Sequence, residues 1–352
     1  MKRNFKFYIL SLKRNLISLF FLLFAILLVI FSSSNLIAAK SGLKLWALSV
    51  VPSLFPFFIA TNLLNHTKLV NYFSKFFNKI MRPLFNVPGE ASYAFILGLI
   101  SGYPVGAKIV SSLKNANLCT KDEAERMLCF TNNSGPLFII GTVGISLFSN
   151  SAIGFLLLFT HILASISVGI ILGLLSRLKK DYSKPSLKSN LSSNQKIASF
   201  SNLGEVLSES ILDASKTIIL IGGFVILFSI ILAILKQSHV LSVLSVLISP
   251  ILQILHIPTQ FAEGIISGLF ELTNGILLIC NIPCKNIWIN ILCCAFLLSF
   301  GGFSVLIQVV SVCSKSDIKI KKYLWGKILQ ACLATFYTYI LLNFLPIFSI
   351  NL

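Results

Sequence analysis

Gly98-Leu-Ile-Ser-Gly-Tyr-Pro-Val-Gly-Ala-Lys108 lies within strongly apolar sequence, yet it contains three glycines, a proline and a lysine. Proline disfavours helical backbone at the preceding Tyr103, and glycine permits backbone angles at Gly102 that other residues avoid. In a lipid core, such irregular backbone is tolerated only where it packs in protein or lines a wet cavity. Gly268-Leu-Phe-Glu-Leu-Thr-Asn-Gly275 is its counterpart in the second half of the chain. We interpret these two interrupted segments as the functional centre of a polytopic membrane protein.

The composition places the chain among all-α integral membrane proteins. Of its 352 residues, 56% are hydrophobic and 11% are charged, and the mean hydropathy is +0.89, whereas a soluble domain carries about a quarter charged residues. The net charge of +18 comes mostly from Lys and Arg between the apolar runs, where they determine topology beside anionic lipid. No basic and aromatic platform accompanies them, so we expect no binding of nucleic acid. The eight cysteines have neither disulfide nor zinc spacing, and we expect no cofactor or metal centre.

About seven apolar stretches predict transmembrane helices, and two more predict re-entrant hairpins. Residues 16–31 follow a basic N-terminus and are long for a cleavable signal peptide, so we expect an uncleaved first span. Hairpins are expected at 90–113, with the tip near Gly102 to Pro104, and at 259–282. A straight span is the alternative for the first of these. The remaining spans are expected at 43–64, 127–148, 153–175, 211–235, 288–313 and 325–348.

The two halves of the chain repeat the same order of elements. Pro258 lies 170 residues after Pro88, and Gly268 lies 170 residues after Gly98. Each half is predicted to contain a span, an amphipathic interfacial helix, a hairpin, a broken span and a closing span. We therefore divide the chain into an N-terminal signal-anchor span (1–41), a first repeat (42–176), a basic cytoplasmic linker (177–209) and a second repeat (210–352).

The distribution of Lys and Arg predicts the orientation. With a cytoplasmic N-terminus, the basic clusters at 68–82, 114–126, 177–196 and 315–322 all lie inside. The first hairpin then enters from the inside and the second from the outside. The repeats are therefore antiparallel, which is the architecture of many secondary transporters with sites at the bilayer midplane. We expect a multi-pass protein of the cell membrane, with the lipid bilayer as its surroundings.

The hairpin tips and the broken spans are expected to bring polar groups together at mid-membrane. Half-helix ends expose unpaired amides and carbonyls, and Asn, Ser and Thr add neutral donors and acceptors, which suits a small polar solute or an ion. Glu271 is the acid expected there, and an intramembrane acid can bind a coupling cation, Na⁺ or H⁺. The alternative for Glu271 is a hydrogen bond to a hairpin end, and for Asn132 and Asn133 it is capping of a helix break. The candidate binding residues are Gly102, Tyr103, Pro104, Asn132, Asn133, Ser134, Glu271, Thr273, Asn274, Gly301, Gly302 and Gln308.

Other polar residues predict structure rather than chemistry. Thr120, followed by the acidic residues of Lys121-Asp-Glu-Ala-Glu-Arg126, is expected to cap a helix. His161 stands alone in an apolar span, and we expect it to form hydrogen bonds between helices. The sequence contains no Gly-x-Ser-x-Gly, no His-Glu-x-x-His and no phosphate-binding glycine loop, so we do not expect an enzyme.

Several runs resemble a known family. They are Val51-Pro-Ser-Leu-Phe-Pro-Phe57, Met81-Arg-Pro-Leu-Phe-Asn-Val-Pro-Gly89, Gly102-Tyr-Pro-Val-Gly-Ala-Lys108, Glu123-Ala-Glu-Arg126, Asn132-Asn-Ser-Gly-Pro-Leu-Phe-Ile-Ile-Gly141 and Glu271-Leu-Thr. Together, over residues 42–348, they resemble the YlbJ-type sporulation integral membrane proteins. That family carries the nucleoside-recognition Gate domain, which also occurs in concentrative nucleoside transporters and ferrous iron permeases.

The resemblance implies a two-hairpin core in an endospore-forming bacterium, with a solute and a coupling cation held at the tips and adjacent broken spans. By position, Gly102 to Pro104 with Ser134 correspond to one half of that site, and Glu271 with Gly301-Gly302 to the other. The transporters carry Gln, Thr and Glu after the first hairpin's glycine, whereas this chain has Tyr103-Pro104. The match at that position therefore implies a gated site but not a nucleoside.

The sequence thus predicts a transporter-like protein, required for sporulation, that binds or moves a small polar solute, nucleoside-like or an ion, between two hairpins. The alternative is a non-transporting membrane factor for assembly of the spore cortex or envelope. Such a factor acts through a membrane or spore-envelope protein partner, or as a homo-oligomer.

Overall fold

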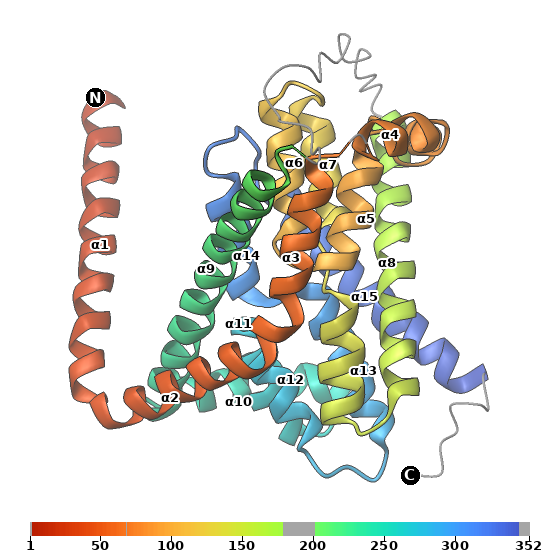
Figure 1. Cartoon of the computed structure of the whole chain (residues 1–352). Coiled ribbons are helices and arrows are strands. Elements are labelled where there is room, and N and C mark those ends of the chain that lie inside the picture. Colours follow the sequence, from red (N-terminus) through yellow and green to blue (C-terminus); the bar gives the residue numbers. More distant parts are fainter. Residues whose placement is uncertain (1, 68, 179–200, 345–352) are drawn as a thin grey trace.

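The computed structural model describes residues 2–67, 69–178 and 201–344, and every regular element in these ranges is a helix (Figure 1). The predicted all-helical class is confirmed. Four helical segments are long and apolar enough to cross a membrane: Ser32–Leu64, Ser151–Leu178, Leu203–Gln237 and Ile287–Cys313. The count of seven spans stays a prediction. Residues 179–200 of the predicted linker and 345–348 of the last predicted span lie outside the described residues.

The N-terminal part of the chain is a helix that stands apart from the body. α1 (Lys2–Ile30) is separated from the other helices, and α2 (Ser32–Leu45) connects it to them (Figure 1). α2 continues through a π-helical segment, η1 (Trp46–Val50), into α3 (Val51–Asn65). The Trp46 indole donates a hydrogen bond to the Ile218 carbonyl oxygen at 2.9 Å, which fixes the opening helix of the first repeat against that of the second.

Residues 42–176 are the predicted first repeat, and this division of the chain stays a prediction. The predicted amphipathic helix is α4 (Leu69–Ile80), extended by η2 (Met81–Phe85). The hairpin consists of α5 (Ala91–Ser101) and α6 (Val105–Asn115), separated by residues 102–104. The broken span consists of α7 (Lys121–Thr131) and the π-helical η3 (Leu137–Leu147), with a break at 132–136, and α8 (Ser151–Leu178) closes the repeat.

The second repeat has the same order. Its elements are α9 (Leu203–Gln237), α10 (Val240–Ile254), the short 3₁₀ helix η4 (Thr259–Phe261), the hairpin α11 (Ala262–Phe270) and α12 (Leu272–Cys280), the broken pair α13 (Ile287–Phe300) and α14 (Gly302–Cys313), and α15 (Lys321–Phe344). In Figure 1 the α5–α6 hairpin enters from the top and the α11–α12 hairpin from the bottom, and α4 and α10 lie at opposite ends. This is the arrangement that antiparallel repeats require.

Glycine allows the hairpins to pack closely. A Cβ at Gly98 or at Gly106 would overlap the Thr131 carbonyl oxygen, and one at Gly275 would overlap Gly268 in the partner helix of its own hairpin. Small residues let helix backbones approach each other where lipid supplies no hydrophobic driving force. The first hairpin is therefore pressed onto the end of α7, and the two helices of the second are pressed together.

The N-terminus of α7 is fixed by the predicted cap. The Glu123 amide donates to the Thr120 hydroxyl at 3.3 Å, and the Thr120 amide donates to the Glu123 carboxylate at 2.8 Å. This reciprocal pair satisfies two amides that would otherwise lack partners, so the prediction for Thr120 is confirmed.

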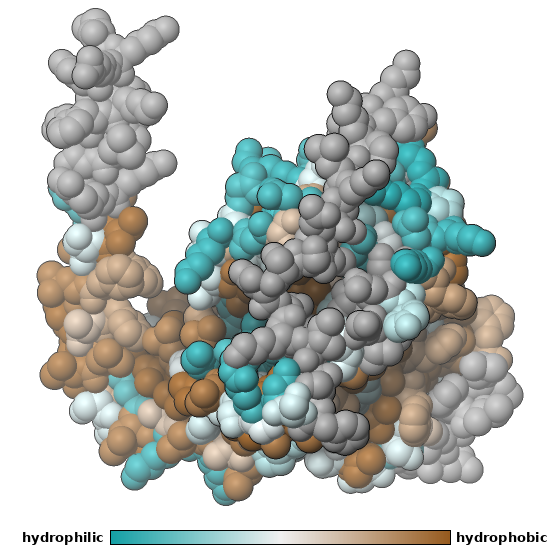
Figure 2. Space-filling view, turned by 45° about the horizontal axis from the view of Figure 1, so that its top comes forward, coloured by the Kyte–Doolittle hydropathy of each residue, from teal (hydrophilic) through white to brown (hydrophobic). Residues whose placement is uncertain are grey.

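The surface divides by hydropathy. Large apolar side chains are exposed on the outward faces of the helices, such as Phe155 at 58% and Phe336 at 54%. Figure 2 shows apolar surface around the flanks and hydrophilic residues gathered over the end where α6 and α7 meet. An apolar surface of this extent suits lipid as the surrounding solvent.

Candidate functional site

The two hairpin tips meet at a small, partly open cavity. Its volume is about 70 Å³, and polar groups of both repeats line it. Six of the predicted binding residues contribute to its wall: Gly102, Tyr103, Ser134, Glu271, Thr273 and Gln308. The rest of the wall is mostly apolar and comes from α3, α9, α14, the break at 132–136 and their neighbours, namely Val50, Leu54, Gly135, Phe138, Ile221, Val225, Leu272, Ser304 and Val305.

The tip of the first hairpin reaches across to the second repeat. The Tyr103 hydroxyl donates to the Leu298 carbonyl oxygen at 3.3 Å, and the Ser134 hydroxyl donates to the same oxygen at 3.2 Å. Leu298 lies in the last turn of α13, where carbonyl groups lack partners within the helix. The broken end of α13 therefore accepts hydrogen bonds from the hairpin and from the broken span of the other repeat.

Gly102 shapes that tip. Its φ of +79° is the left-handed region that favours glycine. A Cβ at Gly102 would lie 2.8 Å from the Gly135 amide nitrogen, so only glycine lets the tip rest on the break in its own repeat.

The tip of the second hairpin carries the buried acid. Glu271 lies between α11 and α12 with 3% of its surface exposed, and its carboxylate accepts the Asn274 amide at 2.8 Å as the N-cap of α12. Glu271 thus makes the structural hydrogen bond considered from the sequence, and it also lines the cavity. The Thr273 amide and hydroxyl also donate to this carboxylate, so about one of its four lone-pair sites is left, and within the described ranges Glu271 forms no ion pair.

Three other candidate side chains form hydrogen bonds within the protein. Asn132 accepts the Ala107 amide at 3.4 Å and donates to the Tyr323 hydroxyl at 2.8 Å. Asn133 donates to the Phe130 carbonyl at 2.7 Å and accepts from Gln330 at 2.9 Å. Asn274 donates to the Ser229 hydroxyl at 3.0 Å. These contacts fit the capping and positioning alternative, and binding of solute by these residues stays a prediction.

Pro104, Gly301 and Gly302 lie beside the cavity wall rather than in it. Pro104 is the N-cap residue of α6. Gly301 (φ +86°) lies next to the Tyr103 ring, and Gly302 (φ +78°) lies against the Gly268 carbonyl oxygen. They form the backbone bends that place the two tips.

His161 connects the breaks of both repeats. Its Nε2 accepts the Ser134 amide at 3.3 Å, and its Nδ1 lies 2.8 Å from the Ser299 hydroxyl. This fits the predicted role of a hydrogen bond between helices.

A buried lysine beside the site was missed by the sequence reasoning. Lys327 is 1% exposed, and its ammonium donates to the Gln330 side chain at 2.7 Å. It lies 5.2 Å from the Tyr103 ring centroid and 5.8 Å from that of Tyr323, which is cation–π geometry. In the part of the chain that the structure describes, it forms no ion pair. The sequence signal was present, because a charge inside a predicted span is a functional candidate.

A larger groove adjoins the cavity. Its volume is about 380 Å³, and Thr273 lines both spaces. Five hydroxyl groups and no charged side chain line it: Ser49, Ser53, Thr142, Ser146 and Thr273, with Leu45, Leu48, Pro52, Leu137, Leu147 and Leu277. Among the described residues, no group of three His, Cys, Asp or Glu side chains could hold a metal ion.

Comparison with known proteins identifies the family of this chain. The family model described as "Gate: Nucleoside recognition" matches residues 47–176, which cover almost all of the first repeat. The sporulation integral membrane protein YlbJ of Bacillus subtilis (strain 168) is 33% identical over 343 residues, which are 95% of this chain and 83% of that protein. No solved structure matches the chain. On this identity over nearly its whole length, the chain belongs to the YlbJ family of sporulation integral membrane proteins.

Proposed function

We propose that this protein is transporter-like and that it binds or moves a small polar solute between its two hairpin tips during sporulation. The mechanism is alternating access, in which the antiparallel repeats rock around a fixed site. The N-terminus is cytoplasmic in this proposal, because the basic loops then lie inside. The name of the B. subtilis relative supports the role in sporulation, and the Gate match supports a small solute, nucleoside-like or an ion.

The cavity between the tips is the observation that carries the proposal. Tyr103 and Ser134 from one repeat and Glu271 from the other line the same space of about 70 Å³. Because a water molecule occupies about 30 Å³ in the liquid, such a space holds a few waters or one small ion. Pockets for larger ligands measure about 300–1,000 Å³. A nucleoside-like solute therefore requires the tips to separate, and the groove of about 380 Å³ beside Thr273 is large enough to receive it.

Glu271 is the proposed site of the coupling cation. A buried carboxylate without a compensating charge is costly, so a bound H⁺ or Na⁺ stabilises it. The Asn274 amide and the amide and hydroxyl of Thr273 all donate to this carboxylate, so an ion would share its remaining lone pair with them. Movement of the second tip would then depend on whether the ion is present.

Purified protein in liposomes tests this proposal. Uptake of a panel of nucleosides and small metabolites is measured under Na⁺ or H⁺ gradients, for wild type, Glu271→Gln and Glu263→Gln. Glu263 is a matched control, because it lies on the same hairpin but is exposed and pairs with Lys236 at 2.8 Å. We expect saturable uptake that falls by at least about tenfold in Glu271→Gln, which corresponds to about 1.4 kcal/mol, and is unchanged in Glu263→Gln.

The opposite results would overturn the proposal. If no solute is taken up or shifts the melting temperature, and Glu271→Ala leaves sporulation normal, the site has no transport role. Recovery of a stoichiometric protein partner by cross-linking, with no solute binding, would instead support the assembly factor.

A further inference from the structure

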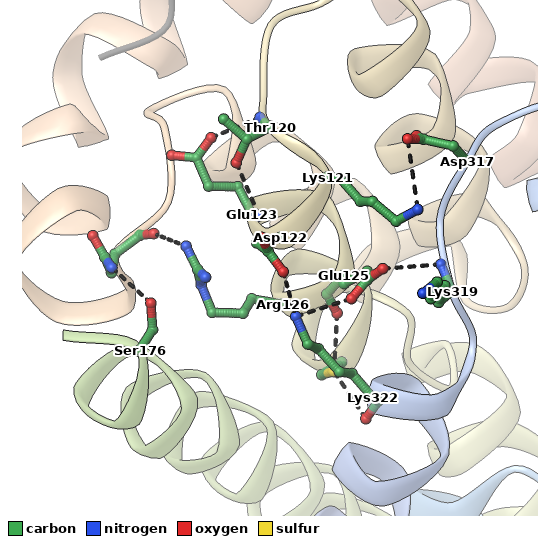
Figure 3. A network of polar contacts seen from close by, with 12 residues as sticks. Thr120, Lys121, Asp122, Glu123, Glu125, Arg126, Ser176, Asp317, Lys319 and Lys322 are labelled. Atoms are coloured by element: carbon green, nitrogen blue, oxygen red, sulfur yellow. Dashed lines mark hydrogen bonds and ion pairs between the residues drawn. The ribbon is translucent and has the colours of Figure 1, made fainter. Parts of the chain in front are cut away.

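Ion pairs between the two repeats gather at one end of the molecule. Figure 3 shows Lys322, at the start of α15, between two acids of α7: Asp122 at 2.6 Å and Glu125 at 2.9 Å. Asp317 lies 3.4 Å from the Lys114 ammonium and 3.6 Å from that of Lys121. Within residues 2–67, 69–178 and 201–344, the ion pairs that join the repeats all lie here.

A backbone contact completes this inter-repeat cluster. The Lys319 amide donates to the Glu125 carboxylate at 3.1 Å, so the loop before α15 is held by backbone as well as side chain. Lys322 also lowers the pKa of the Asp122 carboxyl through their hydrogen bond. The pair is therefore charged at neutral pH.

The contacts of this cluster differ in exposure. The Asp122 and Lys322 side chains are 53% and 46% exposed, and exposed ion pairs are individually weak. The Glu125 side chain is 4% exposed, so Lys322 joins one exposed acid and one buried acid of α7. The cluster therefore combines exposed ion pairs with one buried contact between the repeats.

The opposite end is built differently. The groove of about 380 Å³ is lined by η1, α3, η3 and α12 and reaches the cavity at Thr273. In the described part of the chain no ion pair crosses between the repeats there. The groove therefore adjoins the cavity on this side, while ion pairs join the repeats at the end with the basic loops.

We infer that Asp122, Glu125, Lys322, Asp317, Lys114 and Lys121 form an ionic gate between the repeats, which closes the basic-loop end and must separate in each transport cycle. This inference rests on the proposed function. The exposed pairs, such as Asp122 with Lys322, suit a contact that breaks and re-forms, because each contributes little to the closed state.

Reversible cross-linking tests the gate. Asp122→Cys/Lys322→Cys protein in liposomes is treated with a short reducible thiol cross-linker, and uptake is measured before and after reduction. We expect uptake to stop and then recover. Asp213→Cys/Lys216→Cys is the control, since this exposed pair lies within α9 at 3.4 Å, and it is expected to keep its uptake. Wild type treated in the same way reports any effect of the native thiols. Full uptake by the cross-linked gate variant would overturn the inference.

A readout that needs no transport separates the gate from the proposed function. Cys313 is 3% exposed at the end of α14, where the neighbouring Val312 carbonyl accepts the Ser111 hydroxyl of α6 at 3.5 Å. Lys322→Gln loses the exposed pair with Asp122 and the pair with the buried Glu125, and is expected to raise the rate of maleimide labelling at Cys313 by at least about twofold. Asp122→Asn is expected to have a smaller effect, and Lys216→Gln none.

The labelling and uptake results together distinguish the gate from the transport proposal. Faster labelling of Cys313 without uptake of any tested solute supports the gate while the transport proposal fails. Unchanged labelling in both Lys322→Gln and Asp122→Asn overturns the gate, even if transport is observed.

Discussion

The two hairpins share a backbone plan but differ at their tips. In the first, Gly102 rests on Gly135 of the following break, and in the second repeat Gly302 of the break rests on the Gly268 carbonyl of the hairpin. The first tip sends an aromatic side chain, Tyr103, across to the other repeat. The acid of the second tip, Glu271, instead caps a helix of its own repeat.

The backbone packing is thus similar at the two tips, whereas the polar side chains differ. Glycine contacts recur in both repeats, because each tip must approach the backbone of a broken span. The polar groups do not recur, since the cavity has one aromatic wall and one acidic wall. Each tip also has one buried titratable group nearby, Lys327 over Tyr103 and Glu271 itself. If the two halves are inverted repeats, as predicted, they form an asymmetric site from a similar backbone.

The largest expected effect concerns the sidedness of the two hairpins. Lys315→Cys and Lys285→Cys replace exposed residues at the ends from which the first and second hairpins enter. We expect a membrane-impermeant maleimide to label Lys285→Cys in intact cells and Lys315→Cys only after permeabilisation, because the basic loops are predicted to be cytoplasmic. Labelling of both from the same compartment would show that the two hairpins enter from the same side, and the repeats would then not be antiparallel.

Glycine substitutions test the shared backbone plan. Gly98→Ala and Gly275→Ala each introduce a Cβ that overlaps backbone, and we expect each to lower stability by about 1–3 kcal/mol, as overpacking does. The measurement is thermal unfolding in detergent. Gly223→Ala in α9 is the control, because no atom lies within 4 Å of its Cβ, and alanine there is expected to be neutral or stabilising by up to about 1 kcal/mol. A loss in only one hairpin would show that close packing is not a shared feature.

Most of the frame could be predicted from the sequence, because glycine, proline and long apolar runs are local signals. The breaks near Gly102 and Glu271, the helices α4 and α10 and the cap at Thr120 follow from such signals. The contacts of the site depend on tertiary structure. That Tyr103 and Ser134 share the Leu298 carbonyl, or that Asn133 faces Gln330, requires knowing which helix ends meet. Lys327 was overlooked because it lies only a few residues after a basic loop in the sequence, although the fold buries it.

Lys327→Met tests whether the buried amine beside the first tip stabilises the fold. Removing a buried, unpaired charge while keeping an unbranched chain of similar volume is often neutral or stabilising. We therefore expect the melting temperature to rise or to change by less than the equivalent of about 1 kcal/mol, whereas uptake in liposomes falls. Lys216→Met, at an exposed position on α9, is the control that keeps uptake. A large loss of stability with unchanged uptake would make Lys327 a structural residue only.

The smallest expected effect lies in the contact that the first tip makes across the repeats. Tyr103 and Ser134 donate to one carbonyl oxygen, that of Leu298, so either donor alone still satisfies it. We expect Tyr103→Phe and Ser134→Ala each to cost about 0.5–1.5 kcal/mol in thermal unfolding, and the double variant to cost more than their sum, because the carbonyl then loses both partners. Simple additivity would mean that the two donors act independently and that the crossing contact does not couple the first tip to α13. A positive coupling would show that the two donors act on the Leu298 oxygen as one contact between the repeats, which has no counterpart at the tip of the second hairpin among the described hydrogen bonds.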